Sequence, residues 1–176
     1  MFQEAALLPW LTAAGNVELA LELRGVKRSE RGGIARDLLR RVHLDGFEKR
    51  LPHELSGGMK QRVALARALA QDADVLLMDE PFGALDAITR DRLHEELERI
   101  WTDTGLTILF VTHNAREAVR LGDRVLVFAS RPGRVAHEVK VNLPRPRNLD
   151  SPELAVIAGS ITDRLKHEMG GVVNGN

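Results

Sequence analysis

The sequence predicts an α/β fold built around a parallel sheet. Between residues 55 and 129, short apolar runs typical of strands alternate with segments in which apolar residues recur at helical spacing. One apolar run, 75–78, ends on two adjacent acids, Asp79 and Glu80, and another, 107–112, ends just before His113. Ligands of parallel sheets bind beyond the carboxyl ends of the strands, so these polar residues are candidates for a site.

The composition indicates a globular chain and excludes several classes. The 176 residues, 44% of them hydrophobic and 28% charged, are enough for one domain with a core. Lys and Arg number 25, as do Asp and Glu, so no basic excess favours nucleic-acid binding. The absence of cysteine excludes disulfides and thiolate metal sites. Apolar runs such as 106–111 are far shorter than the roughly 18 residues of a membrane span, and the acidic start does not suggest a signal peptide.

In the first half of the chain, helical spacing is the main signal. The spacing predicts a helix over 11–24 that stops at Gly25, and a second helix over 29–43 with Ser29 as its N-cap. Ser56 is expected to cap a third helix. Its apolar stripe comprises Met59, Val63, Ala66 and Ala70.

The second half alternates strands with helices before it changes character. Residues 143–154 are rich in proline and charge, like a linker, and Asp150 or Ser151 is expected to cap a last amphipathic helix that ends near Met169. That helix either packs on the rest of the chain or stays solvated. The residues before it are expected to form strands over 74–79, 107–112 (buried), 124–129 and 135–141, helices over 86–103 and 114–121, and a hairpin turn over 131–134.

Ser56, Gly57 and Gly58 together suggest an anion site. A helix start presents unpaired N–H groups and the positive end of the helix dipole, and glycine lets another group approach the backbone closely. A phosphate is the natural ligand of such a site. The alternative is a capped helix whose glycines serve only the preceding turn.

Asp79, Glu80 and His113 suggest phosphoryl chemistry. A carboxylate at a strand end can hold Mg²⁺, and a second carboxylate can polarise a water for attack on a phosphoryl group. The alternatives are that the two acids only solvate the strand end, and that His113 caps the following helix.

Taken in order, five elements resemble the ATP-binding subunit of an ABC transporter. They are Gln3, LSGGMKQR from residue 55, VLLMDEP from residue 75, GALD from residue 83 and VTHN from residue 111. The resemblance covers about residues 1–138. One departure is Met59, which stands where many family members have glutamine.

The resemblance implies catalytic and metal-binding roles. Asp79 matches the acid that holds Mg²⁺, and Glu80 matches the catalytic glutamate that activates water. His113 matches the switch histidine that contacts the γ-phosphate. Gln3 matches the Q-loop glutamine, which reaches the metal and the attacking water and links to the membrane subunit.

The resemblance also implies a dimer. Ser56, Gly57 and Gly58 match the signature motif, which covers ATP held by the other cassette of a head-to-tail pair, and Asp86 matches the D-loop at the dimer interface. The implied cofactors are ATP and Mg²⁺. The implied partners are a second ABC ATPase subunit, a membrane permease and, indirectly, a solute-binding protein, with no nucleic acid.

The family fold is a P-loop NTPase-like ABC ATPase core, here N-terminally truncated, with a helical subdomain and a C-terminal helix. The expected domains are 1–142, with the helical subdomain at 11–54, and a tail at 143–176. The expected location is cytoplasmic, peripheral on the inner face of the cell membrane. A finer resemblance is to the ATPases of importers of nitrate, sulfonates and taurine. The stretches that carry it are FQEAALLPW, MDEPFGALDAITR, SRPGRV and LPRPR. This resemblance implies an ATPase that energises uptake of such a solute.

The glycine-rich loop GxxxxGK[S/T], which wraps the phosphates of ATP in this family, does not occur in the chain. The chain alone is therefore expected to be inactive. One alternative is a non-catalytic partner that lends its signature motif to an intact cassette. Another is a truncated or misannotated fragment in which an internal valine codon, or a codon near it, was read as a start at Met1. A DNA-repair ATPase is a distant third, because sustained heptads, zinc-binding cysteines and a basic excess are lacking.

Overall fold

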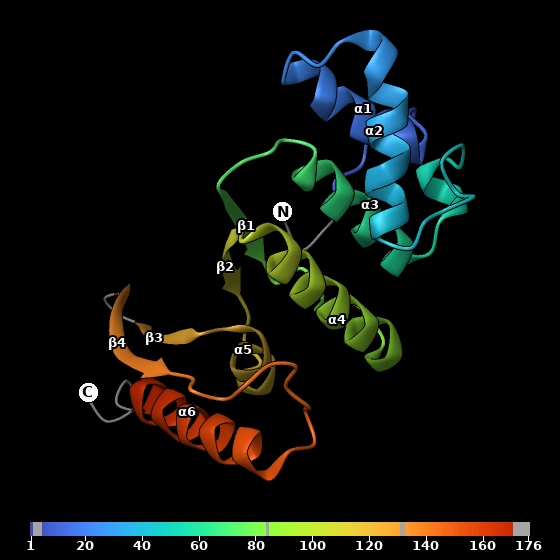
Figure 1. The fold of residues 1–176 in the computed structure, drawn as a ribbon. Helices are drawn as coiled ribbons and strands as arrows, with labels where there is room; N and C mark the ends of the chain where they lie inside the picture. The colour runs from blue at the N-terminus through green and yellow to red at the C-terminus, as the bar shows by residue number, and fades with distance from the viewer. Residues whose placement is uncertain (2–4, 84, 131–132, 171–176) are drawn as a thin grey trace. The chain divides into compact units, whose positions relative to one another are not determined.

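The chain divides into two units, Met1–Leu109 and Phe110–Asn176, each of which is described by itself. The computed structural model describes residues 1, 5–83, 85–130 and 133–170. Figure 1 shows the elements in chain order. They are α1 (Ala13–Leu23), α2 (Arg28–Arg41), the short 3₁₀ helix η1 (Pro52–Glu54), α3 (Gly57–Leu69), β1 (Val75–Asp79), α4 (Ala87–Thr104), β2 (Thr107–Val111), α5 (Ala115–Leu121), β3 (Arg124–Ser130), β4 (Gly133–Lys140) and α6 (Pro152–Gly170).

In the first unit, α1 packs against α2 and α3 through a face of small and branched apolar residues that includes Ala13, Val17 and Leu21. Thr12 caps α1 by accepting a hydrogen bond from the Gly15 N–H at 3.0 Å. The buried Asn16 donates to the carbonyls of Leu8, Leu11 and Thr12 and accepts from the Leu8 N–H. One amide side chain therefore fixes the loop that leads into the helix.

The start of α2 differs from its prediction. The helix begins at Arg28 with Lys27 as its N-cap, and Ser29 lies exposed within the first turn, so the prediction of a Ser29 cap is wrong. Contacts other than a side-chain cap support this end of the helix. Arg31 Nε donates to the Val26 carbonyl at 2.8 Å, and Glu30 places a negative charge near the positive end of the helix dipole.

Short strands follow α3. β1 pairs with β2, and the Thr107 N–H donates to the Asp74 carbonyl at 3.2 Å, so the starts of the two strands lie side by side. Met1 extends the pairing: its amino group donates to the Leu77 carbonyl at 2.7 Å, and its carbonyl accepts from the Asp79 N–H at 3.0 Å.

The strand predicted over 107–112 forms as β2, but the prediction that it is buried is wrong. Val75, Leu77 and Leu109 are 49%, 57% and 54% exposed, whereas Leu76 and Met78 are buried. Successive side chains of a strand point to opposite faces, so one face of this sheet packs in the core. The described residues leave the other face open.

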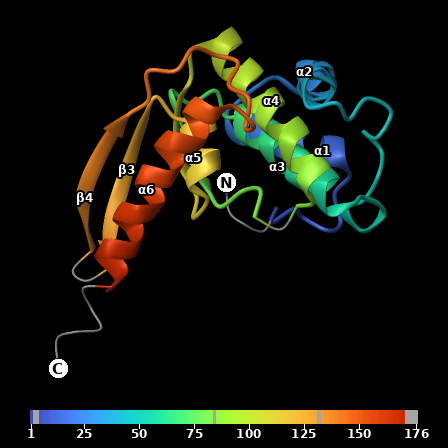
Figure 2. The same cartoon turned by 90° about the horizontal axis from the view of Figure 1, so that it is seen from below.

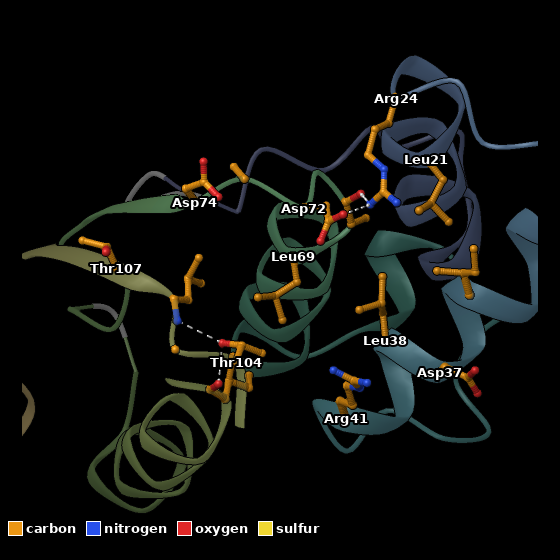
Figure 3. A pocket seen from close by; sticks show the side chains of 16 residues that line it. Leu21, Arg24, Asp37, Leu38, Arg41, Leu69, Asp72, Asp74, Thr104 and Thr107 are labelled. Atoms are coloured by element: carbon orange, nitrogen blue, oxygen red, sulfur yellow. Dashed lines mark hydrogen bonds and ion pairs between the residues drawn. The ribbon is translucent and has the colours of Figure 1, made fainter. Parts of the chain in front are cut away.

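A groove lies at the starting ends of β1 and β2. Figure 3 shows Leu21, Leu38 and Leu69 lining it, with charged residues around them. An ion pair of 3.5 Å joins Arg24 to Asp72 beside this lining. The groove has a volume of about 590 Å³ and lies between the helices and the strand starts.

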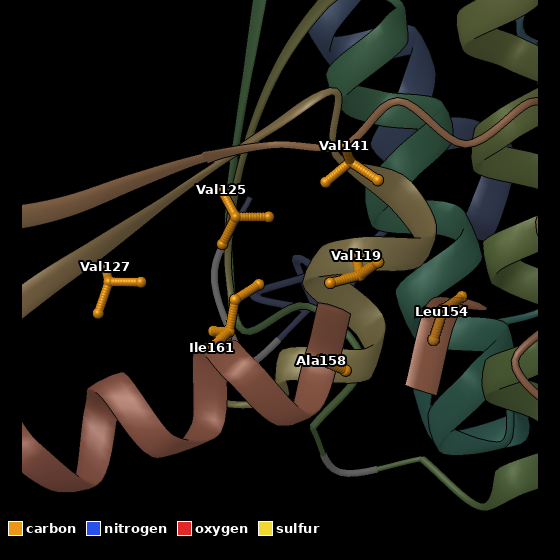
Figure 4. Close-up of a cluster of buried hydrophobic side chains, with 7 residues drawn as sticks. All are labelled: Val119, Val125, Val127, Val141, Leu154, Ala158 and Ile161. Atoms are coloured by element: carbon orange, nitrogen blue, oxygen red, sulfur yellow. The ribbon is translucent and has the colours of Figure 1, made fainter. Parts of the chain in front are cut away.

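In the second unit, β3 and β4 form an antiparallel hairpin with Arg124 opposite Lys140 and Phe128 opposite Val135. The register shifts after Val127, where β4 carries one extra residue. Figure 2 shows α6 lying along this hairpin. Figure 4 shows the core that α6 and the hairpin share with α5, made of Val119, Val125, Val127, Val141, Leu154, Ala158 and Ile161. The last helix is therefore packed rather than solvated, and Ser151 caps it by accepting from the Leu154 N–H at 3.2 Å.

Two arginines fix the proline-rich segment before α6. Arg147, only 6% exposed, donates to the carbonyls of Val119 at 2.8 Å and Gly122 at 2.7 Å, and also reaches the carbonyls of Arg120, Val141 and Leu143. Arg145 donates to the Leu121 carbonyl at 2.6 Å and to Asp123 at 2.8 Å. The segment predicted to resemble a linker is thus tied to the end of α5.

Arg147→Met is expected to destabilise the second unit by about 2–4 kcal/mol, because it removes donors from several buried carbonyls without replacing them. Faster amide hydrogen exchange in α6 would report the change. Arg164→Met, at an exposed position of α6, is the matched control and should leave that exchange unchanged. Equal exchange in the two variants would contradict a clamp at Arg147.

Candidate functional site

The start of α3 has the features of an anion site. Ser56 is the N-cap: its hydroxyl accepts from the Met59 N–H at 3.2 Å, and its carbonyl accepts from the Lys60 N–H at 2.9 Å. Within the part of the chain that the structure describes, the N–H groups of Gly57 and Gly58 have no acceptor. Ser56 and Gly57 are exposed, so the free N–H of Gly57 and the positive end of the helix dipole face solvent.

The structure requires a glycine at residue 58 but not at residue 57. A Cβ on Gly58 would lie 2.5 Å from the Thr89 methyl carbon, a distance that real side chains do not adopt. Gly58 is therefore needed for the close contact between the starts of α3 and α4. A Cβ on Gly57 would meet nothing within 4 Å, so no contact inside the chain requires a glycine there.

Thr89 joins Gly58 to Asp86. Asp86 is the N-cap of α4 and accepts from the Thr89 N–H at 2.9 Å. This backbone hydrogen bond, helped by the Thr89 hydroxyl, lowers the pKa of the Asp86 carboxyl below its ordinary value. One threonine thus brings together two of the predicted residues, Gly58 and Asp86.

Asp79 and Glu80 stand at the end of β1, as predicted. Asp79 is exposed, and Glu80 is half-buried in a left-handed conformation with φ of 41°. A non-glycine residue seldom adopts this conformation, so the backbone at Glu80 is strained. The chain turns sharply there, because the Glu80 carbonyl accepts from the Gly83 N–H at 3.2 Å.

Gln3 lies outside the described residues, but the chain just after it is held in place. Arg67 of α3 donates to the carbonyls of Ala6 at 2.8 Å and Ala5 at 3.0 Å. Burial lowers the pKa of the Arg67 guanidinium below its ordinary value. The helix that begins at Ser56 therefore also anchors the segment that follows Gln3.

His113 belongs to the second unit and is exposed. Asn114, not His113, caps α5: its side-chain oxygen accepts from the N–H groups of Arg116 at 3.0 Å and Glu117 at 3.4 Å. Thr112 supports the same turn by accepting from the Asn114 N–H and donating to the Glu117 carboxylate. The alternative that His113 caps the following helix is therefore wrong.

The groups described above fit a phosphate better than a metal ion held by protein side chains alone. No group of three or more His, Cys, Asp or Glu side chains gathers in the described ranges. Mg²⁺ bound with nucleotide commonly takes one or two carboxylates, with phosphate and water filling the other positions, and Asp79 can supply one carboxylate. The groove of Figure 3 lies at the opposite ends of the strands, next to Asp74 and Thr107, so it cannot serve the same ligand as Asp79.

Three contact residues had no signal of their own in the sequence. Thr89 and Arg90 lie in an ordinary amphipathic helix, and Arg67 is one of two arginines in α3. Their partners are distant in sequence or are backbone carbonyls, which carry no sequence signature. A pattern of residue types therefore could not reveal them.

Comparison with known proteins identifies the family. The family model described as "ABC transporter" matches residues 1–83. The aliphatic sulfonates import ATP-binding protein of Bacillus cereus is 42% identical over 98% of this chain and 67% of its own length. The chain belongs to the ABC transporter family.

Two further ABC transporter proteins are similar in sequence to this chain. An uncharacterized ABC transporter ATP-binding protein of Methanocaldococcus jannaschii is 48% identical over 96% of the chain, which spans 63% of that protein. The taurine import ATP-binding protein of Rhizobium johnstonii is 51% identical over 82% of the chain, which spans 55% of that protein. The chain thus spans less than two thirds of the length of these two relatives.

Solved structures confirm the fold predicted for this ABC transporter chain. An ATP-binding cassette, solved as a dimer in a post-hydrolysis state bound to ADP and Pi, matches with a TM-score of 0.69 and 36% identity. The match covers 80% of the chain and 62% of the solved cassette. In the described part of the chain, no helix combines the length and hydropathy needed to cross a membrane.

Gly58→Ala is expected to lower the free energy of unfolding of this ABC transporter chain by about 1–3 kcal/mol, because the added methyl overlaps Thr89. Gly57→Ala, the matched control, should be neutral or slightly stabilising, since that site is open and alanine favours a helix. Urea denaturation measures both variants.

A second substitution tests the cause. Thr89→Ser removes the methyl group but keeps the hydroxyl beside Asp86, so the double variant Gly58→Ala, Thr89→Ser should recover most of the lost stability. If the double variant is as unstable as Gly58→Ala, the contact with Thr89 is not what requires a glycine at residue 58.

Proposed function

We propose that this chain belongs to the ATP-hydrolysing subunit of an importer, with Ser56, Gly57 and Gly58 facing the phosphates of ATP held by a second cassette. The observation that carries the proposal is the exposed start of α3, where Gly57 is open and its N–H has no acceptor among the described residues. A glycine that its own chain does not need is well suited to a ligand that comes from outside. Asp86, at the neighbouring start of α4, lies beside the same partner.

The proposed chemistry is hydrolysis of ATP by a positioned water. Bound Mg²⁺ would neutralise charge on the phosphates, with Asp79 as its carboxylate ligand from this chain. Glu80, which directly follows Asp79 in a left-handed conformation, accepts a proton from the attacking water. His113 and Gln3 are assigned to the γ-phosphate and the metal by their match to the family motifs.

The proposed solute is a small sulfonate. Two of the similar proteins are named for import, one of taurine and one of aliphatic sulfonates, and both solutes carry a sulfonate group. The ATPase would act on the inner face of the membrane, where a permease carries the solute and a solute-binding protein delivers it.

The groove of Figure 3 is the proposed contact with the permease. Its lining is apolar at Leu21, Leu38 and Leu69, and its border carries both signs of charge, as in the Arg24–Asp72 pair. Such a groove accepts a short amphipathic segment better than a phosphate. Its lining does not include Asp79 or Glu80, so a partner bound there would leave these two acids accessible.

Glu80→Gln, made in the full gene product, is expected to lower kcat for ATP hydrolysis by at least about 100-fold, because the amide cannot accept the proton from water. ATP binding should stay within about threefold, since Glu80 is assigned to the water rather than to the nucleotide. Steady-state phosphate release and a nucleotide-binding titration measure the two effects. Normal turnover by the variant would refute the role of Glu80.

Leu38→Asp is expected to weaken binding to the permease about tenfold or more, because a carboxylate would replace an apolar side chain of the groove. Binding to detergent-solubilised permease measures the effect, and circular dichroism checks that α2 is intact. Ser29→Asp adds the same charge at an exposed position of α2 and should bind normally. Unchanged binding by the folded Leu38→Asp variant would exclude the groove as the contact.

A further inference from the structure

The loop after Glu80 is built from two weak turns. The Glu80 carbonyl accepts from the Gly83 N–H at 3.2 Å, and the Phe82 carbonyl accepts from the Leu85 N–H at 3.2 Å. Both distances lie at the long end of the range for N–H···O bonds. The same loop holds the strained backbone of Glu80, whose φ is 41°.

Arg90, in the first turn of α4, reaches back to both sides of this loop. Its Nε donates to the Phe82 carbonyl at 3.2 Å, and its Nη2 donates to the Leu85 carbonyl at 2.7 Å. The guanidinium is half-buried, and its donors have a fixed planar geometry. One rigid group therefore sets the spacing between two carbonyls of the loop.

The Phe82 ring anchors the same loop from the other side. It is 1% exposed and meets the ring of His94 edge-on, with centroids 5.5 Å apart and an interplanar angle of 66°. His94 lies one turn after Arg90 on α4. The first two turns of this helix thus hold both the backbone and the side chain of Phe82.

We propose that Arg90 is a positioning residue for Glu80: by fixing the carbonyls of Phe82 and Leu85, it holds the turn that keeps Glu80 in its left-handed conformation. The consequence for turnover rests on the proposed function, in which Glu80 activates water. The effect on the loop itself does not. Lysine cannot replace Arg90, because a single ammonium group cannot match the planar fork that spans the two carbonyls.

The loop is tested on the 176-residue chain by amide hydrogen exchange. Arg90→Met should speed exchange at the N–H groups of Gly83 and Leu85 by about tenfold or more, because their turns lose the brace, while the amides of α3 keep their rates. Arg99→Met, at an exposed position of the same helix, is the control and should change neither. Unchanged exchange at Gly83 and Leu85 in Arg90→Met would overturn the proposal.

Turnover by the full gene product gives the second readout. Arg90→Met and Arg90→Lys should lower kcat about 10-fold or more with KM for ATP within about twofold, and Arg90→Met added to Glu80→Gln should cause no further loss. A further loss in the double variant would show that Arg90 does not act through Glu80. If Glu80→Gln alone keeps full turnover, the proposed function fails, while faster exchange in Arg90→Met still supports the positioning of the loop.

Discussion

The first turn of α4 is the junction on which the candidate site depends. Thr89 contacts Gly58 at the start of α3 and hydrogen-bonds Asp86, while Arg90 spans the loop that follows Glu80. A shift of this turn would therefore move two parts of the candidate site at once. They are the helix start that is proposed to bind phosphate and the carboxylate that is proposed to activate water. Protein interiors are close-packed, so such a junction transmits a displacement rather than absorbing it.

Local signals predicted much of this arrangement. Ser56 as the cap of α3 and the acids at the end of β1 depend on residues close together in sequence, and the structure confirms their positions. Ser29 is not the cap because α2 begins before it, at Arg28, which places Ser29 inside the first turn. The strand over 107–112 was expected to be buried because its residues are apolar, but burial depends on what covers the sheet, and a strand sequence does not contain that information.

The long-range contacts could not be predicted in this way. The reason for Gly58 is a methyl group on another helix, and the reason for Arg147 is a set of carbonyls around the end of α5. A backbone carbonyl is the same in every residue, so no residue type marks the partner of an arginine. The proline-rich segment resembled a linker in composition, yet Arg145 and Arg147 tie it to its unit. The predicted domain boundaries, 1–142 and 143–176, stay a prediction.

The central claim is that the start of α3 binds phosphate of ATP held by another cassette. Nuclear magnetic resonance of the ¹⁵N-labelled chain, mixed with an unlabelled intact ABC cassette carrying a catalytic-glutamate substitution, tests it most directly. With Mg²⁺ and ATP, the amide signals of Gly57 and Gly58 should shift and become protected from exchange, whereas ADP or the cassette alone should leave them unchanged. Signals of Gly57 and Gly58 that do not respond to ATP, in a mixture shown to form dimers by light scattering, would contradict the account.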